Sequence, residues 1–232
     1  MELPNRFIKS HKILFDPYTE LYLALCEFDY QSFDESLFDE LAIDRPVNLI
    51  SSLFVRQSEF LAGRYAAKLA LTAIDRKLCF DQVVVGLRKQ PIFPDNLIGT
   101  LSHSHIMAIC AVTTSKEVHY LGVDIEPTMT RAVSFAVERK VFTCNELNSL
   151  MVHGINREVA ATLIFSAKES IFKAFSKQIK HGINFENIKL STSINRNHVI
   201  SMTFEVQELK LNKKVTVTAR IIKDHILTLV AQ

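Results

Sequence analysis

The sequence predicts an α+β protein whose two halves follow the same order, and three observations support this fold class. A segment rich in Ala and Leu, from Arg56 to Ile74, is typical of a helix, and short stretches rich in β-branched residues follow it. The second half repeats this order, with a long helix near Ala160 to Lys177. Only 6 Gly and 6 Pro occur in 232 residues, which leaves little room for linkers. Because no strict residue-level repeat relates the halves, a single α+β domain is the alternative.

The first helix is expected to begin near Ser58, a residue type that caps helix N-termini. Arg64 and Lys68, four residues apart, share a flank of this helix beside its apolar stripe. The stripe consists of Phe60, Ala67, Leu71 and Ile74. After the helix we expect a strand at 82–87, a Pro-rich loop at 88–96, and strands at 98–105, 106–114 and 120–127.

The second half is expected to contain more helix before its strands. The helical segments are 130–142, 144–151 and the long helix near Ala160 to Lys177. The strands are 185–190, 198–206, 213–222 and 225–231. If the two halves are a duplicated unit, we expect a cleft between them, which is a common location for ligands.

Charge, cysteines and hydropathy exclude several classes of protein. Lys and Arg number 27 against 25 Asp and Glu, so the net charge of +2 does not favour nucleic acid as a partner. The 4 cysteines have no metal-ligand spacing, and we expect reduced, mostly buried thiols. No stretch approaches the ~20 apolar residues of a membrane span, and no signal-peptide core follows the N-terminal charges. These features predict a cytoplasmic protein without a membrane span.

The segment Gly122–Glu126 places two carboxylates on one strand face. Asp124 and Glu126 alternate with Ile125, so both point to the same side, about 7 Å apart at Cα. Two carboxylates at this spacing suit Mg²⁺, which binds one or two protein carboxylates together with substrate phosphates. The alternative is an acidic strand end that only meets solvent.

The long helix offers a third carboxylate. Its apolar stripe is formed by Ile164, Ala167, Ile171, Ala174 and Phe175. Glu169 and Lys173 lie on nearly the opposite face, and Lys168 lies nearer the edge of the stripe. Glu169 and Lys173 form either an exposed ion pair worth ~0.3–0.5 kcal/mol, or a cation ligand beside a phosphate-neutralising lysine.

A cluster of possible phosphate ligands lies in the segment 101–105. Ser102, His103 and Ser104 are followed by His105, and on a strand the two histidines face the same way. A surface histidine or a zinc-binding His pair is the alternative, although no clear third zinc ligand is near. The absence of GxSxG, Walker A and GxGxxG motifs argues against α/β-hydrolase, P-loop and Rossmann proteins.

Taken in order, four segments resemble the successive motifs of the 4′-phosphopantetheinyl transferase superfamily, in the branch of enterobactin-synthase-activating enzymes. They are EFLAGRYAAKLAL, RKQPIFPDNLIGTLSHSH, LGVDIEP and FSAKESIFKAF. The resemblance implies a pseudo-dimer of two similar α+β lobes, which we place at 1–125 and 126–232, with the active site in the cleft between them. It also implies coenzyme A as substrate and Mg²⁺ as cofactor.

The implied reaction moves the phosphopantetheine arm of coenzyme A to a serine of an apo carrier protein and releases 3′,5′-adenosine bisphosphate. By motif position, Asp124, Glu126 and Glu169 would hold Mg²⁺ against the pyrophosphate. Glu169, or a water that it holds, is the expected acceptor of the serine proton. Lys173 would stabilise the transferring phosphate, and Lys168 would either assist or pack.

The resemblance also assigns residues to coenzyme A. Arg56 and Arg64 match the family's arginine pair and would bind the 3′-phosphate. Ser102 and His103 match the motif that contacts the pyrophosphate. The loop near the adenine contributes Arg88, Lys89, Gln90 and Pro91. The run GTLSH at 99–103 departs from the GSITH type of the siderophore branch, which leaves the subfamily open.

The expected partner is an apo acyl or peptidyl carrier protein. Siderophore and other nonribosomal peptide synthetases, polyketide or polyunsaturated fatty-acid synthases and housekeeping carriers all stay open, as does Mn²⁺ in place of Mg²⁺. The family typically docks the carrier between Thr128 and Ala160, where the apolar residues are either docking surface or ordinary core. They are Val133, Phe135 and Val137. The chain length favours a monomer. A non-catalytic coenzyme A-binding module and a purely structural protein are the alternatives.

Overall fold

The computed structural model describes residues 6–17, 19–176, 184–196, 199–207 and 213–232. The chain divides into two compact units, Met1–His119 and Tyr120–Gln232. The expected boundary between residues 125 and 126 falls inside strand β7 (Leu121–Pro127), which pairs along its whole length with β11 (His225–Ala231). Strand β7 therefore belongs entirely to the second unit. Both units combine helix and sheet, so the α+β class is confirmed.

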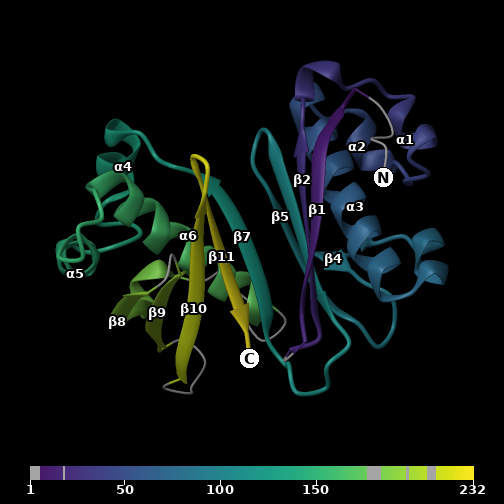
Figure 1. Cartoon of the computed structure of the whole chain (residues 1–232). Helices are drawn as coiled ribbons and strands as arrows, with labels where there is room; N and C mark the ends of the chain where they lie inside the picture. Colours follow the sequence, from purple (N-terminus) through teal and green to yellow (C-terminus); the bar gives the residue numbers. More distant parts are fainter. Residues whose placement is uncertain (1–5, 18, 177–183, 197–198, 208–212) are drawn as a thin grey trace. The chain divides into compact units, whose positions relative to one another are not determined.

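The first unit contains a four-stranded antiparallel sheet and one long helix (Figure 1). Its elements are β1 (Ile8–Asp16), β2 (Leu21–Phe28), η1 (Tyr30–Ser32), α1 (Leu37–Glu40), α2 (Val47–Ile50), α3 (Phe54–Ile74), η2 (Arg76–Phe80), β3 (Val84–Val85), β4 (Pro91–Ile92), β5 (Ile98–His103) and β6 (Met107–Thr113). The strands of the main sheet lie in the order β1-β2-β6-β5, and β3 pairs with β4. Helix α3 packs on β2 and β6.

Helix α3 begins earlier than its sequence suggests. Its first residue is Phe54, so Ser58 is inside the helix, where its hydroxyl donates to the Val55 carbonyl at 2.7 Å. The expected cap at Ser58 is therefore wrong. Four alanines of α3 are at most 1% exposed, and their small side chains bring the helix close to the sheet. They are Ala62, Ala66, Ala67 and Ala70.

The second unit contains a five-stranded antiparallel sheet and a second long helix. Its remaining elements are α4 (Arg131–Val137), α5 (Cys144–Met151), α6 (Arg157–Phe175), η3 (Phe185–Asn187), β8 (Ile188–Arg196), β9 (Val199–Val206) and β10 (Lys213–Ile222). The sheet order is β7-β11-β10-β9-β8, and α6 packs on β7 and β11. Helix α4 is shorter than expected because Glu138, with a ψ of 147°, is not helical and Arg139 has a positive φ of 70°. Lys177 and His198, included in the expected elements, lie outside the described residues.

The two units share one connection pattern. In each, the last strand pairs antiparallel with the strand that precedes the long helix: β6 with β2, and β11 with β7. The long helix then packs on that pair of strands. Each unit also has its own cluster of buried apolar residues. This arrangement agrees with two similar α+β units. No helix in the described part of the chain is long and apolar enough to cross a membrane.

Gly122 allows α6 to lie directly on β7. A Cβ at this position would meet the Ser170 carbonyl oxygen at 1.9 Å and the Ala174 nitrogen at 2.7 Å. Only a residue without a side chain fits such an approach of two backbones. The glycine therefore sets the distance between the two elements that carry the acidic residues.

Candidate active site

Asp124 is a buried carboxylate of the second unit whose two oxygens both have side-chain partners. It is 2% exposed on β7, and two side chains of α6 bind its two oxygens. Lys173 Nζ lies 2.6 Å from Oδ1, and the Ser166 hydroxyl donates to Oδ2 at 2.7 Å. A charged, hydrogen-bonded carboxylate is thus fixed where β7 meets α6.

A set of buried hydroxyl groups holds α6 against β11 next to Asp124. Thr228 Oγ1 lies 2.9 Å from Ser166 Oγ and 2.6 Å from Ser170 Oγ, and Thr228 pairs with Asp124 in the sheet. All three hydroxyl residues are fully buried. The sequence reasoning missed them. The available signal was the pair of serines four residues apart in FSAKES, which places two hydroxyls on one face of the helix.

Glu126 and Glu169 are electrostatically coupled to Asp124. The pKa of Glu126 is raised to about 8, chiefly by burial, with Asp124 and Glu169 adding to the rise and Lys173 opposing it. Burial also raises the pKa of Glu169, with Lys173 lowering it and Asp124 raising it. The four expected residues of this group, three carboxylates and one lysine, are therefore coupled electrostatically, and Lys173 and Asp124 are in direct contact.

These carboxylates suit a hard divalent cation. Carboxylate oxygens are the protein ligands that Mg²⁺ prefers, and a cation would relieve the mutual repulsion that raises the pKa of Glu126. Within the described ranges, no three Asp, Glu, His or Cys side chains already converge as a metal cluster. In the structure Lys173 supplies the positive charge beside Asp124.

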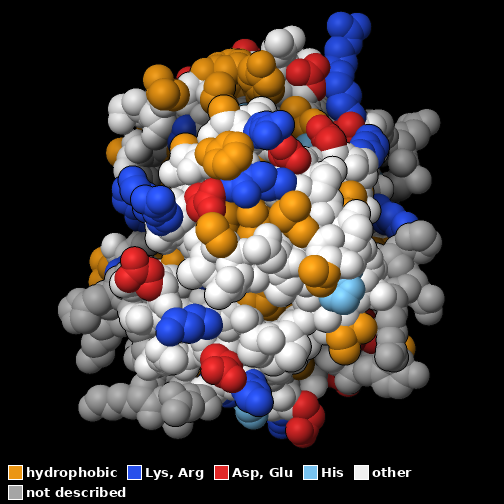
Figure 2. Space-filling view, turned by 90° about the vertical axis from the view of Figure 1, so that its left-hand side faces the viewer, with side chains coloured by type: hydrophobic (Ala, Val, Ile, Leu, Met, Phe, Trp, Pro, Cys, Tyr) orange, Lys and Arg blue, Asp and Glu red, His pale blue; other side chains and the backbone are white. Residues whose placement is uncertain are grey.

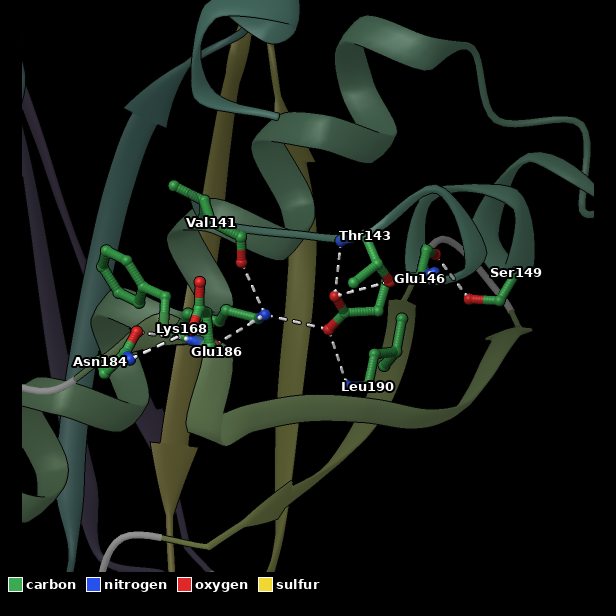
Figure 3. A network of polar contacts seen from close by, with 9 residues as sticks. Val141, Thr143, Glu146, Ser149, Lys168, Asn184, Glu186 and Leu190 are labelled. Carbon is green, nitrogen blue, oxygen red and sulfur yellow. Dashed lines mark hydrogen bonds and ion pairs between the residues drawn. The ribbon is translucent and has the colours of Figure 1, made fainter. Parts of the chain in front are cut away.

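Lys168 belongs to a different network of polar contacts, drawn in Figure 3. Its ammonium is 1% exposed, pairs with Glu146 at 3.0 Å, and donates to the Val141 and Phe185 carbonyls at 2.7 and 3.2 Å. Glu146 accepts from the backbone of Thr143 and of Leu190. Burial lowers the pKa of Lys168, and Glu146 raises it. The expected coenzyme A contact at Lys168 is therefore not supported, because its ammonium already has buried partners.

The first unit contains a pocket of about 170 Å³ whose lining includes two arginines, a lysine and a histidine. Arg56 and Arg64 come from α3, Lys89 from the turn between β3 and β4, and His103 from the end of β5. Lys89 has a positive φ of 62°, which is unusual for a residue with a side chain. The pocket brings Arg56 and His103, which are 47 positions apart in the sequence, within 2.7 Å of each other.

Arg64 is buried without full hydrogen bonding. It is 8% exposed, and its Nε is a buried atom without a hydrogen-bond partner. Its guanidinium lies over the Phe60 ring, 4.4 Å from the centroid. Burial lowers the pKa of Arg64 to about 10, and Arg56 contributes to that fall. A buried cation with an unused donor favours an anion in this pocket.

Of the other residues expected to contact coenzyme A, some line this pocket and some do not. Pro91 lines it, and the Gln90 side chain instead accepts from the Arg88 backbone at 2.9 Å within the β3–β4 turn. Ser102 is buried on β5, one residue before His103. The structure thus supports Lys89, Pro91 and His103 as pocket residues more directly than Arg88, Gln90 and Ser102.

Comparisons with known proteins agree with this arrangement. Residues 120–230 match the model of the 4′-phosphopantetheinyl transferase superfamily, and residues 48–113 match that of the 4′-phosphopantetheinyl transferase N-terminal domain. Enterobactin synthase component D of Salmonella typhi is 32% identical over 183 residues, which cover 79% of this chain and 74% of that protein. The chain belongs to the 4′-phosphopantetheinyl transferase superfamily.

More distant relatives carry the same activity in their names. The 4′-phosphopantetheinyl transferase Svp of Streptomyces mobaraensis is 28% identical over 142 residues, covering 59% of this chain and 54% of that protein. The transferase PptT of Mycobacterium tuberculosis is 24% identical over 146 residues, covering 60% of each chain. The present chain is thus a transferase that moves phosphopantetheine from coenzyme A to a carrier protein. The two matched ranges fall one in each unit.

Proposed function

We propose that Asp124, Glu126 and Glu169 hold the Mg²⁺ with which this transferase acts on coenzyme A. The observation that carries the proposal is the buried carboxylate of Asp124, held by Lys173 and Ser166, to which Glu126 and Glu169 are electrostatically coupled. Three carboxylates that repel one another around one lysine form a site that gains from a divalent cation. When bound, Mg²⁺ would offset the charge on the pyrophosphate oxygens of coenzyme A.

Glu169 is the proposed acceptor of the serine proton, directly or through one water. Burial raises its pKa above that of an ordinary glutamate, which brings it nearer to the working pH of a general base. Lys173 is half-exposed and pairs with Asp124. Its ammonium is the proposed partner of the transferring phosphate, because a lysine donates as a compact positive charge.

Arg56, Arg64 and Lys89 are the proposed ligands of the 3′-phosphate of coenzyme A. Support comes from the buried Arg64 Nε that lacks a partner and from the cationic lining of the pocket. His103 and Ser102 are assigned to the phosphate groups as well, and Arg88, Gln90 and Pro91 to the adenine side. Lys168 is assigned a structural role.

The proposed acceptor is a carrier of a siderophore-type peptide synthetase, since six relatives are named enterobactin synthase component D. The docking surface we propose is α4, where Val133 and Phe135 are about half exposed. Arg157 holds the Phe135 ring, with its guanidinium 4.0 Å from the centroid. Figure 2 shows the side with α4 and α5, where hydrophobic side chains gather beside Lys and Arg. Val137 packs on the core instead.

We also propose that the protein is a monomer located in the cytoplasm. One chain supplies both the carboxylate group and the cationic pocket. The four cysteines are free thiols, as in a reducing compartment.

A thermal-shift titration tests the proposed metal site. Coenzyme A with Mg²⁺ is expected to raise the Tm more than coenzyme A alone, because a ligand of the folded state stabilises it. Glu169→Gln should lose this extra shift and turnover, and Glu158→Gln on the same helix should keep both. A full Mg²⁺-linked shift in Glu169→Gln would contradict the assignment. Parallel assays of apo carriers from several synthase types then test the choice of carrier.

A further inference from the structure

A carboxylate lies in the wall of the cationic pocket. Glu59, one turn after Arg56 on α3, lines the pocket together with Arg56, Arg64, Lys89 and His103. Its side chain is only 13% exposed. A buried carboxylate beside an anion site repels the anion, and it can aid binding only by stabilising positive charge on a neighbouring side chain.

Glu59 faces three side chains. Its Oε2 lies 3.6 Å from Arg56 Nη1 and 3.6 Å from His103 Nδ1, and its Oε1 lies 3.2 Å from Nδ1 of His105. His105 follows β5 and its side chain is 76% exposed. The carboxylate thus connects α3 to the end of β5.

The contacts fix the tautomer of His103. Arg56 Nη1 lies 2.7 Å from His103 Nε2. Because a guanidinium only donates, Nε2 must accept, and the imidazole proton is on Nδ1, on the side of Glu59. His103 is therefore neutral in this arrangement, although it lies among pocket groups that favour a phosphate.

We propose that Glu59 is a positioning residue that couples phosphate binding in this pocket to proton uptake by His103. When Arg56 turns to the phosphate, its hydrogen bond to His103 Nε2 is broken. A proton from solvent then forms an N–H bond at Nε2, and the imidazolium donates to the phosphate through Nε2. Glu59 stabilises the imidazolium through Nδ1, while Arg56, Arg64 and Lys89 oppose the added charge. This inference rests on the proposed binding of the 3′-phosphate.

Calorimetry in two buffers of different ionisation enthalpy measures the proton uptake directly. Adenosine 3′,5′-bisphosphate is the probe, at about pH 7.5, where its phosphates with pKa near 6 are mostly ionised. The full-length protein is expected to take up a net fraction approaching ~1 proton per bound probe, since one imidazole accepts one proton. Glu59→Gln, which keeps the shape of the side chain, should reduce the uptake at least ~2-fold because the imidazolium loses its partner.

Two further variants separate the possible outcomes. His103→Asn should abolish the uptake, and His105→Asn, which removes the exposed neighbour of Glu59, should leave it unchanged. The inference would be overturned if the wild type bound the probe without taking up protons. It would also be overturned if Glu59→Gln or His103→Asn took up as many protons as the wild type. Either result would leave the proposed 3′-phosphate site intact. Failure of the wild type to bind the probe would overturn both.

Discussion

The environment of Arg64 leads to a prediction about the KM for coenzyme A. Replacing it by Met keeps the packing on Phe60 and removes the buried guanidinium. A charge-assisted hydrogen bond contributes about 1.5–3 kcal/mol, so the KM for coenzyme A is expected to rise roughly 10- to 100-fold. The KM for dephospho-coenzyme A, which lacks the 3′-phosphate, should change little in steady-state assays.

The exposed Lys116 of the same unit serves as the matched control. Lys116→Met removes one positive charge, as Arg64→Met does, and should leave both KM values unchanged. Equal losses with both substrates in Arg64→Met would show that Arg64 does not recognise the 3′-phosphate.

The raised pKa of Glu126 predicts that the stability of the folded protein depends on pH. Its pKa in the folded protein is about 8, above the ordinary value of 4.5, so the folded state retains a proton that the unfolded state releases. Stability contributed by this group is therefore present at low pH and falls as the pH rises from about 5 to about 8. Melting curves without metal should show this fall. Glu126→Gln should remove most of it, and a decline of equal size in the variant would rule out Glu126 as its source.

At the scale of elements, the contact between β7 and α6 depends on Gly122. Gly122→Ala is expected to lower the free energy of unfolding by about 2 kcal/mol or more, because its Cβ would collide with the backbone of α6. Gly63→Ala on α3 is the matched control, since its Cβ would meet only Leu101, at 3.9 Å. Urea titrations measure both variants. Equal stability of the Gly122 variant and the wild type would show that α6 does not lie so close to β7.

The ion pair of Lys168 and Glu146 joins α6 to the N-terminus of α5 and to β8 (Figure 3). Lys168→Met leaves a buried carboxylate unpaired and should lower the free energy of unfolding by about 3–5 kcal/mol. The exposed Lys189→Met is the control. Below its melting temperature, the Lys168 variant should have a KM for coenzyme A within about 2-fold of wild type. The reason is that the Lys168 side chain is buried against partners within the protein. A large rise in KM with unchanged stability would instead restore Lys168 to the coenzyme A site.

At the scale of the whole molecule, the periodicity of apolar residues predicted the two long helices and most strands. The apolar stripe of α6 is buried as expected, with Ile164, Ala167 and Ile171 fully buried. The hairpin β1–β2 was not predicted, because β1 exposes most of both faces and carries no alternating pattern.

The site was predictable where its residues lie in one motif and less so where distant segments meet. Strand alternation predicted Asp124 and Glu126 on one face and helical spacing predicted Glu169 beside Lys173, and in the structure Glu126 is electrostatically coupled to the other three. The sequence left Lys168 either assisting or packing because its partner Glu146 is 22 positions away, on another helix. The burial of Arg64 and the role of Ser166 likewise depend on strands that the helix sequence does not reveal.

Intact mass spectrometry of an apo carrier protein tests the central claim most directly. With coenzyme A, Mg²⁺ and the wild-type chain, the carrier is expected to gain the mass of one phosphopantetheine arm on its serine. Chelation of the metal should prevent the gain, and Asp124→Ala should do the same. Carriers of several synthase types that all keep their apo mass with the active wild-type protein and Mg²⁺ would contradict the account.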